Sequence, residues 1–444
     1  MRAQPLPSDP PRPPASGPVS SWHECHGCGA FQLVPPLGAG MTARCWRCDR
    51  VLRRGHRDPL GHGAALAAAA LVLLGVVATM TMMTVSTVGI SHQADLLGGP
   101  MELWRRGMWE LALVVGFTTL VAPFALLAGL LTVLLLLRRQ RPPRQLRLLF
   151  RAVLWLTPWS MIEVFLLGAF VAYTKLQDLV QIGIGPALFA LGVLTFVMTW
   201  LDSELSPPAI WEEMQRRGVA DPPLPAPGAR PALPADPVSC HVCGHVQPAP
   251  QEHGHATCRR CDAALHRRKP NGIARAWALC LAALICYVPA NYYPVLTVMQ
   301  LGAGAPSTIL GGVVELVAAR MWPLAALVFA ASIAVPVLKL TALMFMLACT
   351  QLGAARWLVE RTRLYGIVLG IGRWSMVDIY MESLLGALVQ FGRVVTIEPG
   401  VGAVAFCAVV ILTMLAAESF DPRLMWDAAA AADRRGRAAE PLPP

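Results

Sequence analysis

Four Cys-x-x-Cys pairs constrain the fold of this chain more than any other feature. They form two sets of four, namely Cys25, Cys28, Cys45 and Cys48, and Cys240, Cys243, Cys258 and Cys261. Each set has the spacing of a four-cysteine zinc ribbon, in which two short knuckles place four thiolates around one soft ion. A long apolar stretch follows each set. The sequence therefore predicts one unit, a ribbon followed by a membrane domain, that occurs twice.

The two halves also match residue by residue. Cys25 and Cys240 are 215 positions apart, and the same separation relates Trp159-Ser160-Met161 to Trp374-Ser375-Met376. A chance alignment would not keep cysteine and tryptophan in step over about two hundred residues, and a solenoid would need more and shorter repeats. The pattern indicates that a whole domain was duplicated.

The composition is that of a membrane protein. The chain is 55% hydrophobic and 14% charged, whereas soluble domains carry about 25% charged residues. A helix that crosses a bilayer needs about 20 mostly apolar residues. Eight such stretches occur, at 64–83, 108–137, 148–173, 180–201, 273–299, 321–350, 364–389 and 400–418. We expect an all-α polytopic membrane protein with two four-helix transmembrane domains, each preceded by a small four-cysteine zinc ribbon.

The remaining segments are expected to be connections and tails. Residues 1–20 are rich in Pro and have no apolar core of a signal peptide, and residues 202–236 are also rich in Pro, which favours a semi-extended tether. The expected order is a disordered tail at 1–20, zinc ribbon 1 at 21–58, membrane domain 1 at 62–201, a Pro-rich linker at 202–236, zinc ribbon 2 at 237–269, membrane domain 2 at 272–420 and a C-terminal tail at 421–444.

Arginine placement predicts the orientation. Six arginines follow the second apolar stretch, at Arg138, Arg139, Arg141, Arg144, Arg147 and Arg151. Because basic loops stay on the cytoplasmic side, we expect both ribbons, the linker and both termini in the cytoplasm. The net charge of +10 then indicates attraction to anionic lipid rather than a nucleic-acid partner.

In a reducing cytosol, paired Cys-x-x-Cys motifs indicate metal rather than a disulfide. We therefore expect two structural zinc ions, one per ribbon, and metal binding should supply much of the folding free energy of each ribbon. A disulfide or redox pair stays the alternative. The flanking His23, His26, His241 and His245 could compete as ligands, but four thiolates already close the site.

Charged residues within the apolar stretches carry a functional signal, because such residues are costly in a bilayer and usually face a partner or water. Lys339 lies in the middle of such a stretch, one turn after Pro336, which is expected to kink the helix. Glu163 and Asp378 occupy equivalent positions in the two halves, and Glu382 lies one turn after Asp378. Ordinary interfacial contacts, polar contacts between helices and snorkelling remain the structural alternatives for these charges.

Two segments carry a family resemblance. Residues 331–340, which include Ser332, Pro336 and Lys339, and residues 373–380, which include Asp378, resemble the signature helices of the paraquat-inducible protein A family. Residues 158–165 are the copy in the first half, and the resemblance spans residues 22–427. Asn291-Tyr292-Tyr293-Pro294 fits an Asn-x-x-Pro pattern of the family that the first half lacks.

The resemblance implies an inner-membrane component of a Gram-negative envelope lipid transport system. Such a component passes lipid between the inner membrane and a periplasmic tunnel of MCE-domain proteins, so the implied partners are an MCE-domain protein and membrane phospholipid. An ion-coupled transporter of a small polar solute and a zinc- or redox-responsive membrane sensor are the alternatives. An enzyme is not expected, because the sequence shows no nucleophile–base arrangement and no metal motif with an open position.

Within this interpretation we expect Lys339, Asp378 and Glu382 to line one polar pocket that faces a lipid headgroup. An ammonium group attracts phosphate, and either carboxylate would pair with Lys339 when the pocket is empty. In the first half, Glu163, Lys175 and Asp178 are expected to form a second polar network.

Overall fold

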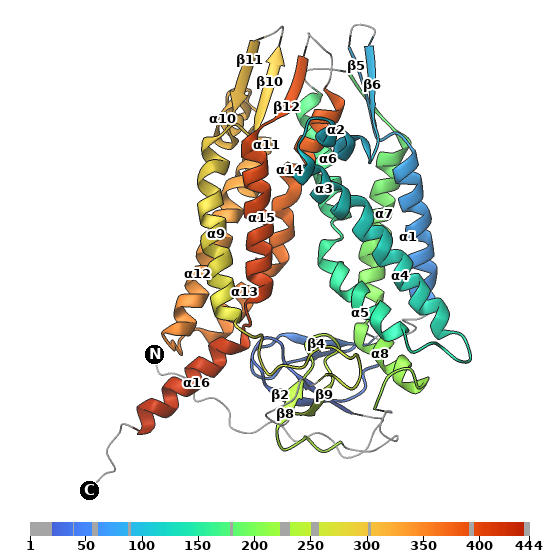
Figure 1. The fold of residues 1–444 in the computed structure, drawn as a ribbon, viewed down its shortest axis with the longest axis vertical. Helices are drawn as coiled ribbons and strands as arrows, with labels where there is room; N and C mark the ends of the chain where they lie inside the picture. The colour runs from blue at the N-terminus through green and yellow to red at the C-terminus, as the bar shows by residue number, and fades with distance from the viewer. Residues whose placement is uncertain are drawn as a thin grey trace.

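The structure is a computed structural model, and it describes residues 20–38, 40–55, 61–87, 90–177, 181–222, 231–249, 257–300, 303–389 and 395–438. The predicted tail at 1–20 therefore lies outside the described residues except for its last position. Figure 1 shows two helical halves side by side, with both ribbons together at one end and short strands at the other. We call these the ribbon end and the sheet end.

Each ribbon consists of short antiparallel strands. In ribbon 1, β1 (Ser21–Glu24) pairs with β2 (Phe31–Val34), and β3 (Thr42–Arg44) pairs with β4 (Val51–Arg54). In ribbon 2, β8 (Pro237–Ser239) pairs with β9 (Val246–Pro248), and Thr257 forms a bridge with Ala264. The two ribbons thus repeat one small scaffold.

The first half contains the following elements in order: α1 (Gly61–Thr79), β5 (Met83–Thr87), β6 (Ile90–Ala94), α2 (Gly98–Arg105), α3 (Trp109–Gly116), η1 (Phe117–Val121), α4 (Ala122–Leu137), α5 (Leu146–Leu156), η2 (Thr157–Trp159), α6 (Ile162–Leu176), β7 (Gln181–Ile184), α7 (Pro186–Glu204) and α8 (Pro207–Arg216).

The second half repeats this order with α9 (Gly272–Tyr292), β10 (Leu296–Gln300), β11 (Ala303–Ser307), α10 (Ile309–Ala318), α11 (Trp322–Phe329), η3 (Ala330–Ala334), α12 (Val335–Gln351), α13 (Leu358–Ile371), η4 (Gly372–Met376), α14 (Val377–Leu388), β12 (Val395–Pro399), α15 (Val401–Ser419) and α16 (Arg423–Ala438). The duplication expected from the sequence is therefore present element by element.

Seven helices in the described part of the chain are long and apolar enough to cross a membrane. They confirm the predicted class of a mostly helical, duplicated membrane protein. The eighth predicted stretch, 364–389, falls on α13, η4 and α14, which are two shorter helices joined by a 3-10 turn. This segment contains three charged residues, Arg373, Asp378 and Glu382, and it is not among the seven apolar helices.

Short strands at the sheet end correct the expectation of an all-helical membrane domain. β5 pairs with both β6 and β7, and β10 pairs with both β11 and β12, all antiparallel. The predicted helix at 273–299 stops at Tyr292 because Pro294 follows, and a residue before proline is disfavoured in the α region. The predicted helix at 180–201 begins later, at Pro186, after β7.

The predicted irregularity at Pro336 is a π-helical turn. η3 ends just before α12, in which Pro336 is the second residue, and η1 stands in the same relation to Pro123 of α4. Proline has no backbone N–H to continue the hydrogen-bond ladder, and single π turns occur where a helix must accommodate such a break. Both long helices are therefore interrupted at equivalent positions.

Two further helices replace segments expected to lack regular structure. α8 lies inside the predicted Pro-rich linker and begins with two prolines, which are tolerated in the first turn of a helix. α16 occupies most of the predicted C-terminal tail. Trp211 of α8 and Trp426 of α16 occupy equivalent positions, and both are buried. Each half therefore ends in a docked helix at the ribbon end.

The two halves meet at α14, which packs against α6 and α2 of the first half. Nearly every residue of α14 is buried. The approach is close because glycine lies at the contact: a Cβ on Gly168 would be 2.8 Å from Tyr380 Cβ, and a Cβ on Gly99 would lie against Ser383. Small residues allow such close packing between membrane helices, where apolar burial alone gives little preference.

We predict that Gly168→Ala destabilises the protein by about 1–3 kcal/mol, because the added carbon overpacks the interface between the halves. Gly192→Ala is the matched control, since no heavy atom lies within 4 Å of its would-be Cβ. Thermal unfolding in detergent should show a lower midpoint for Gly168→Ala alone. Equal midpoints would mean that α6 and α14 do not pack as described.

Candidate functional site

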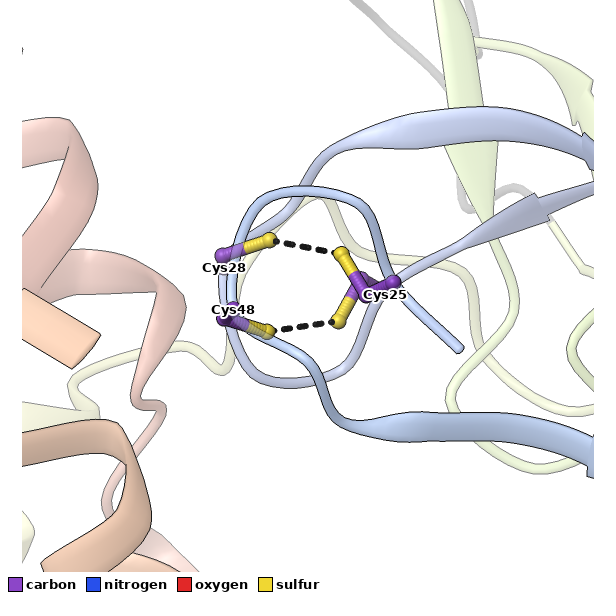
Figure 2. A group of neighbouring side chains, drawn as sticks. Cys25, Cys28 and Cys48 are labelled. Atoms are coloured by element: carbon purple, nitrogen blue, oxygen red, sulfur yellow. Dashed lines mark hydrogen bonds between the residues drawn. The ribbon is translucent and has the colours of Figure 1, made fainter. Parts of the chain in front are cut away.

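The eight predicted ligand cysteines form two compact clusters. Within each set of four, all Sγ atoms lie within 4.8 Å of one another, and all eight side chains are buried. In the first cluster the Sγ atoms of Cys25 and Cys48 are 3.5 Å apart, and those of Cys28 and Cys45 are 3.6 Å apart. Figure 2 shows Cys25, Cys28 and Cys48 with their sulfur atoms directed toward one another.

The second cluster repeats this geometry. The Sγ atoms of Cys240 and Cys261 are 3.5 Å apart, as are those of Cys243 and Cys258. A disulfide has a sulfur–sulfur distance of about 2.0 Å, whereas four sulfurs bound tetrahedrally to zinc at about 2.3 Å lie about 3.8 Å apart. The observed distances fit the metal geometry, so each cluster could hold one metal ion.

The knuckle backbone explains how the thiols converge. Gly29 N–H donates to Cys25 O at 2.8 Å, and Gly244 N–H donates to Cys240 O at 2.9 Å. Both glycines have positive φ, of 72° and 69°, a conformation that glycine adopts without steric cost. The tight turn brings both cysteines of a pair onto one side.

The pKa is lowered for two cysteines in each cluster, Cys25 and Cys45 in the first and Cys240 and Cys258 in the second. The bond with Cys25 is the largest influence on Cys45 and lowers the pKa of that thiol, and the bond with Cys243 acts in the same way on Cys240. Because the thiolate is the metal-binding form, each cluster is prepared to take a cation.

A buried ion-pair cluster lies between the ribbons and the second half. Arg423 Nη1 lies 2.9 Å from Glu24 Oε2 of ribbon 1, and Arg423 Nη2 lies 2.8 Å from Asp421 Oδ2. Arg268 Nη1 lies 3.1 Å from Glu24 Oε1. The Arg423, Glu24 and Asp421 side chains are at most 3% exposed.

The pKa values of the two carboxyl groups shift in opposite directions. Burial raises the pKa of Glu24 despite the charges of Arg423 and Arg268. For Asp421, burial also favours the neutral form, but the hydrogen bonds and charge of Arg423 prevail and lower the pKa. Asp421 therefore stays ionised and holds the Arg423 guanidinium in place.

A cavity of about 420 Å³ lies between the halves. Lys339 lines it and is 4% exposed, and its Nζ has no hydrogen-bond partner in the described structure. Arg373 and Glu418 also line the cavity, and the charge of Glu418 acts on Lys339. The first half contributes Leu154, Thr157 and Pro158.

Asp378 and Glu382 belong to a separate cluster. The charge of Lys175 in α6 acts on both carboxyl groups, although Lys175 belongs to the first half. The Asp378 carboxylate contacts the Ser332 hydroxyl, which lies 2.7 Å from Val328 O. This cluster crosses the boundary between the halves.

These positions correct the predicted grouping. Lys339 does not share a pocket with Asp378 and Glu382: neither carboxylate lines its cavity, and neither acts on its charge. The second predicted network, of Glu163, Lys175 and Asp178, is also not formed as predicted. The charge of Lys175 interacts with Asp378 and Glu382, whereas Glu163 Oε1 lies 3.4 Å from Thr199 Oγ1. Its third member, Asp178, lies outside the described residues. Pro336 shapes the helix and adds no polar group.

Comparisons with known proteins identify the family. The profile described as "Paraquat-inducible protein A" matches residues 60–215 and 273–430. The chain is 32% identical over 415 residues to "Intermembrane transport protein PqiA" of Escherichia coli K12, covering 91% of this chain and 95% of the relative. The chain belongs to the paraquat-inducible protein A family.

Two other relatives are similar to this chain at comparable coverage. "Lipophilic envelope-spanning tunnel protein A" of Escherichia coli K12 is 29% identical over 93% of this chain and 92% of its own length. "Probable intermembrane transport protein" of Haemophilus influenzae is 28% identical over 91% of this chain and 95% of its own length. No solved structure matches the chain.

The family unit includes the two helices that end the halves. The matched segments run through most of α8 and into α16. The equivalent tryptophans Trp211 and Trp426 were the sequence signal that could have predicted both helices. In contrast, no local pattern around Glu24 or Arg423 indicated that they form an ion pair, because they are separated by nearly the whole chain.

We predict that Glu24→Gln lowers the free energy of unfolding by about 1–3 kcal/mol, because the buried Arg423 loses one of its two carboxylate partners and keeps Asp421. Asp49→Asn should change it by less than about 1 kcal/mol, since its ion pair with Arg44 is more than half exposed. Denaturation of the two purified variants compares them. A small effect of Glu24→Gln would show that this pair does not stabilise ribbon docking.

Proposed function

We propose that this protein is an inner-membrane component of a Gram-negative envelope lipid transport system. It would pass lipid between the inner membrane and a periplasmic tunnel of MCE-domain proteins. The observation that carries the proposal is the cavity between the membrane halves, in which the buried Lys339 ammonium has no hydrogen-bond partner among the described residues.

The chemistry of this cavity suits a lipid headgroup. Lys339 supplies three donors, and Arg373 supplies a second cation at the same cavity. Phosphate oxygens accept such bonds, and a buried cation gains most from a charged acceptor because the surroundings are poorly polarisable. Leu154, Val368 and Met414 add apolar surface that would suit the first carbons of the acyl chains.

The names of the relatives support transport over catalysis. Two are called intermembrane transport proteins, and a third is called a lipophilic envelope-spanning tunnel protein. In our proposal the ribbon end and both termini face the cytoplasm, as the arginine-rich loops suggest. The sheet end would then face the periplasm and the MCE-domain partner.

Each four-cysteine cluster is proposed to hold one structural zinc ion. Four thiolates complete a tetrahedral site and leave no position for substrate, so the metal would stabilise the ribbon rather than take part in chemistry. No nucleic acid or enzymatic substrate is part of the proposal.

An ion-coupled transporter is the second candidate. The cluster of Lys175, Asp378 and Glu382 favours it, because charged groups buried between membrane helices are typical of ion and proton pathways. Such coupling would also be compatible with lipid as the cargo.

We predict that a photocrosslinker at Leu369, which lines the cavity, captures phospholipid in a manner that depends on the charge of Lys339. Lys339→Met should reduce the captured phospholipid about tenfold, because losing one charged hydrogen bond lowers the affinity by about that factor. Lys339→Arg should retain the capture. Mass spectrometry of the crosslinked products measures the effect.

The control position for this experiment is Val193, which is 52% exposed on α7. Capture of bulk lipid there should be the same in all three proteins. If capture at Leu369 were independent of Lys339, the cavity would not be a headgroup site.

We predict two zinc ions per chain by elemental analysis. Cys25→Ser and Cys240→Ser should each remove one ion, because a ribbon with three thiolates binds zinc far more weakly. Cys280→Ser is the control and should retain both, since Cys280 lies in α9 and belongs to neither four-cysteine cluster. A zinc content near zero in the unaltered protein would exclude the metal assignment.

A further inference from the structure

The second Cys-x-x-Cys turn of ribbon 2, or second knuckle, contacts the first half through Arg260 and the following Asp262. Arg147 Nη2 of α5 is 3.1 Å from Asp262 Oδ2, and Arg151 Nη1 donates to Asp262 O at 3.4 Å. Arg260 of the same knuckle bonds to Gln215 of α8. Ribbon 2 thus contacts the half that precedes it in the chain, although the chain leaving ribbon 2 enters the second half.

The knuckles of ribbon 1 lie on the second half in the corresponding way. The guanidinium of Arg47 is 4.3 Å from the Trp426 ring centroid of α16. A Cβ on Gly27 would be 2.9 Å from Thr362 Cγ2 of α13. Arg47 and Arg260 are equivalent residues, and so are Thr362 and Arg147. Equivalent residues thus make both contacts, in which each ribbon docks on the other membrane half.

Each ribbon also keeps contact with its own half. Arg53, near the exit of ribbon 1, forms a two-bond ion pair with Glu212 of α8, with N–O distances of 2.7 and 2.8 Å. Arg268, near the exit of ribbon 2, lies 2.6 Å from Asp427 of α16. Arg423 contacts both ribbons, through Glu24 and, at 3.2 Å, through His241. Each ribbon therefore joins the two halves.

The helices that receive the knuckles also form the walls of the cavity. α5 contacts Asp262 near its first turn, and its later residue Leu154 lines the cavity. α13 contacts ribbon 1 at Thr362, and its later residues Val368 and Leu369 line the opposite wall. The separation of α5 and α13 at the ribbon end therefore affects the width of the cavity.

We infer that the two ribbons form a metal-dependent cross-brace. Each ribbon docks a Cys-x-x-Cys knuckle on the opposite membrane half, and together the ribbons fix the spacing of α5 and α13. The metal matters because a ribbon of this size buries too little surface to hold its knuckles without it. Loss of metal from one ribbon should release the helices of the opposite half. This inference does not depend on what the cavity binds.

Hydrogen–deuterium exchange of the full-length protein tests the crossed pattern. Cys25→Ser should speed exchange about tenfold in the first turns of α13 and in α16, and leave α5 within about twofold of the unaltered protein. Cys240→Ser should speed exchange in α5 and leave α13 unchanged. If each variant instead loosened helices of its own half, or loosened α5 and α13 equally, the cross-brace would be wrong.

A second pair of variants keeps the thiols intact in case the cysteine variants fold poorly. Asp262→Asn removes the charge that pairs with Arg147 and should speed exchange in α5 about two- to fivefold, with the metal content retained. Asp49→Asn alters the equivalent residue of ribbon 1, whose carboxylate pairs with Arg44 on the surface, and should change neither helix. Unchanged α5 exchange in Asp262→Asn, with metal retained, would overturn the inference.

Discussion

Close packing between α6 and α14 is the interaction on which the arrangement of the two halves depends. Membrane helices gain little by hiding apolar surface from lipid, so their association requires close contact and polar bonds. Gly168 provides the contact against Tyr380, and the Tyr380 hydroxyl lies 2.9 Å from Thr118 Oγ1 of the first half. These contacts fix the halves toward the sheet end, and the inferred brace would set the spacing of α5 and α13 at the ribbon end.

Divergence within the duplicated fold concentrates charge at the boundary between the halves. Leu126 occupies the position equivalent to Lys339, and Glu163 occupies the position equivalent to Asp378. Each half contributes one lysine to the boundary, and the two lysines lie in different clusters: Lys339 lines the cavity, and Lys175 lies near Asp378 and Glu382. The two halves share a scaffold, and unlike residues at equivalent positions give it two unlike polar sites.

The sequence was sufficient for features that depend on local spacing. Four cysteines at knuckle spacing predicted the two clusters, and paired motifs predicted the repeat. The short strands at the sheet end were missed because a run such as Leu296–Gln300 continues the apolar character of the preceding helix, and periodicity cannot separate the two. The grouping of the charges was also missed. Asp378 and Glu382 lie one turn apart, but Lys175, whose charge acts on both, is 203 residues before Asp378 and belongs to the other half.

The two halves are held together by different kinds of contact at the sheet end and at the ribbon end. Toward the sheet end, van der Waals contact at glycine leaves little freedom, since packed interfaces resist small displacements. At the ribbon end, the contacts include ion pairs, one of them buried, and a cation–π contact, and all of them involve the two four-cysteine ribbons. The cavity at Lys339 lies between these two ends. The glycine contact at one end and the ribbon contacts at the other therefore hold the two halves on either side of this internal site.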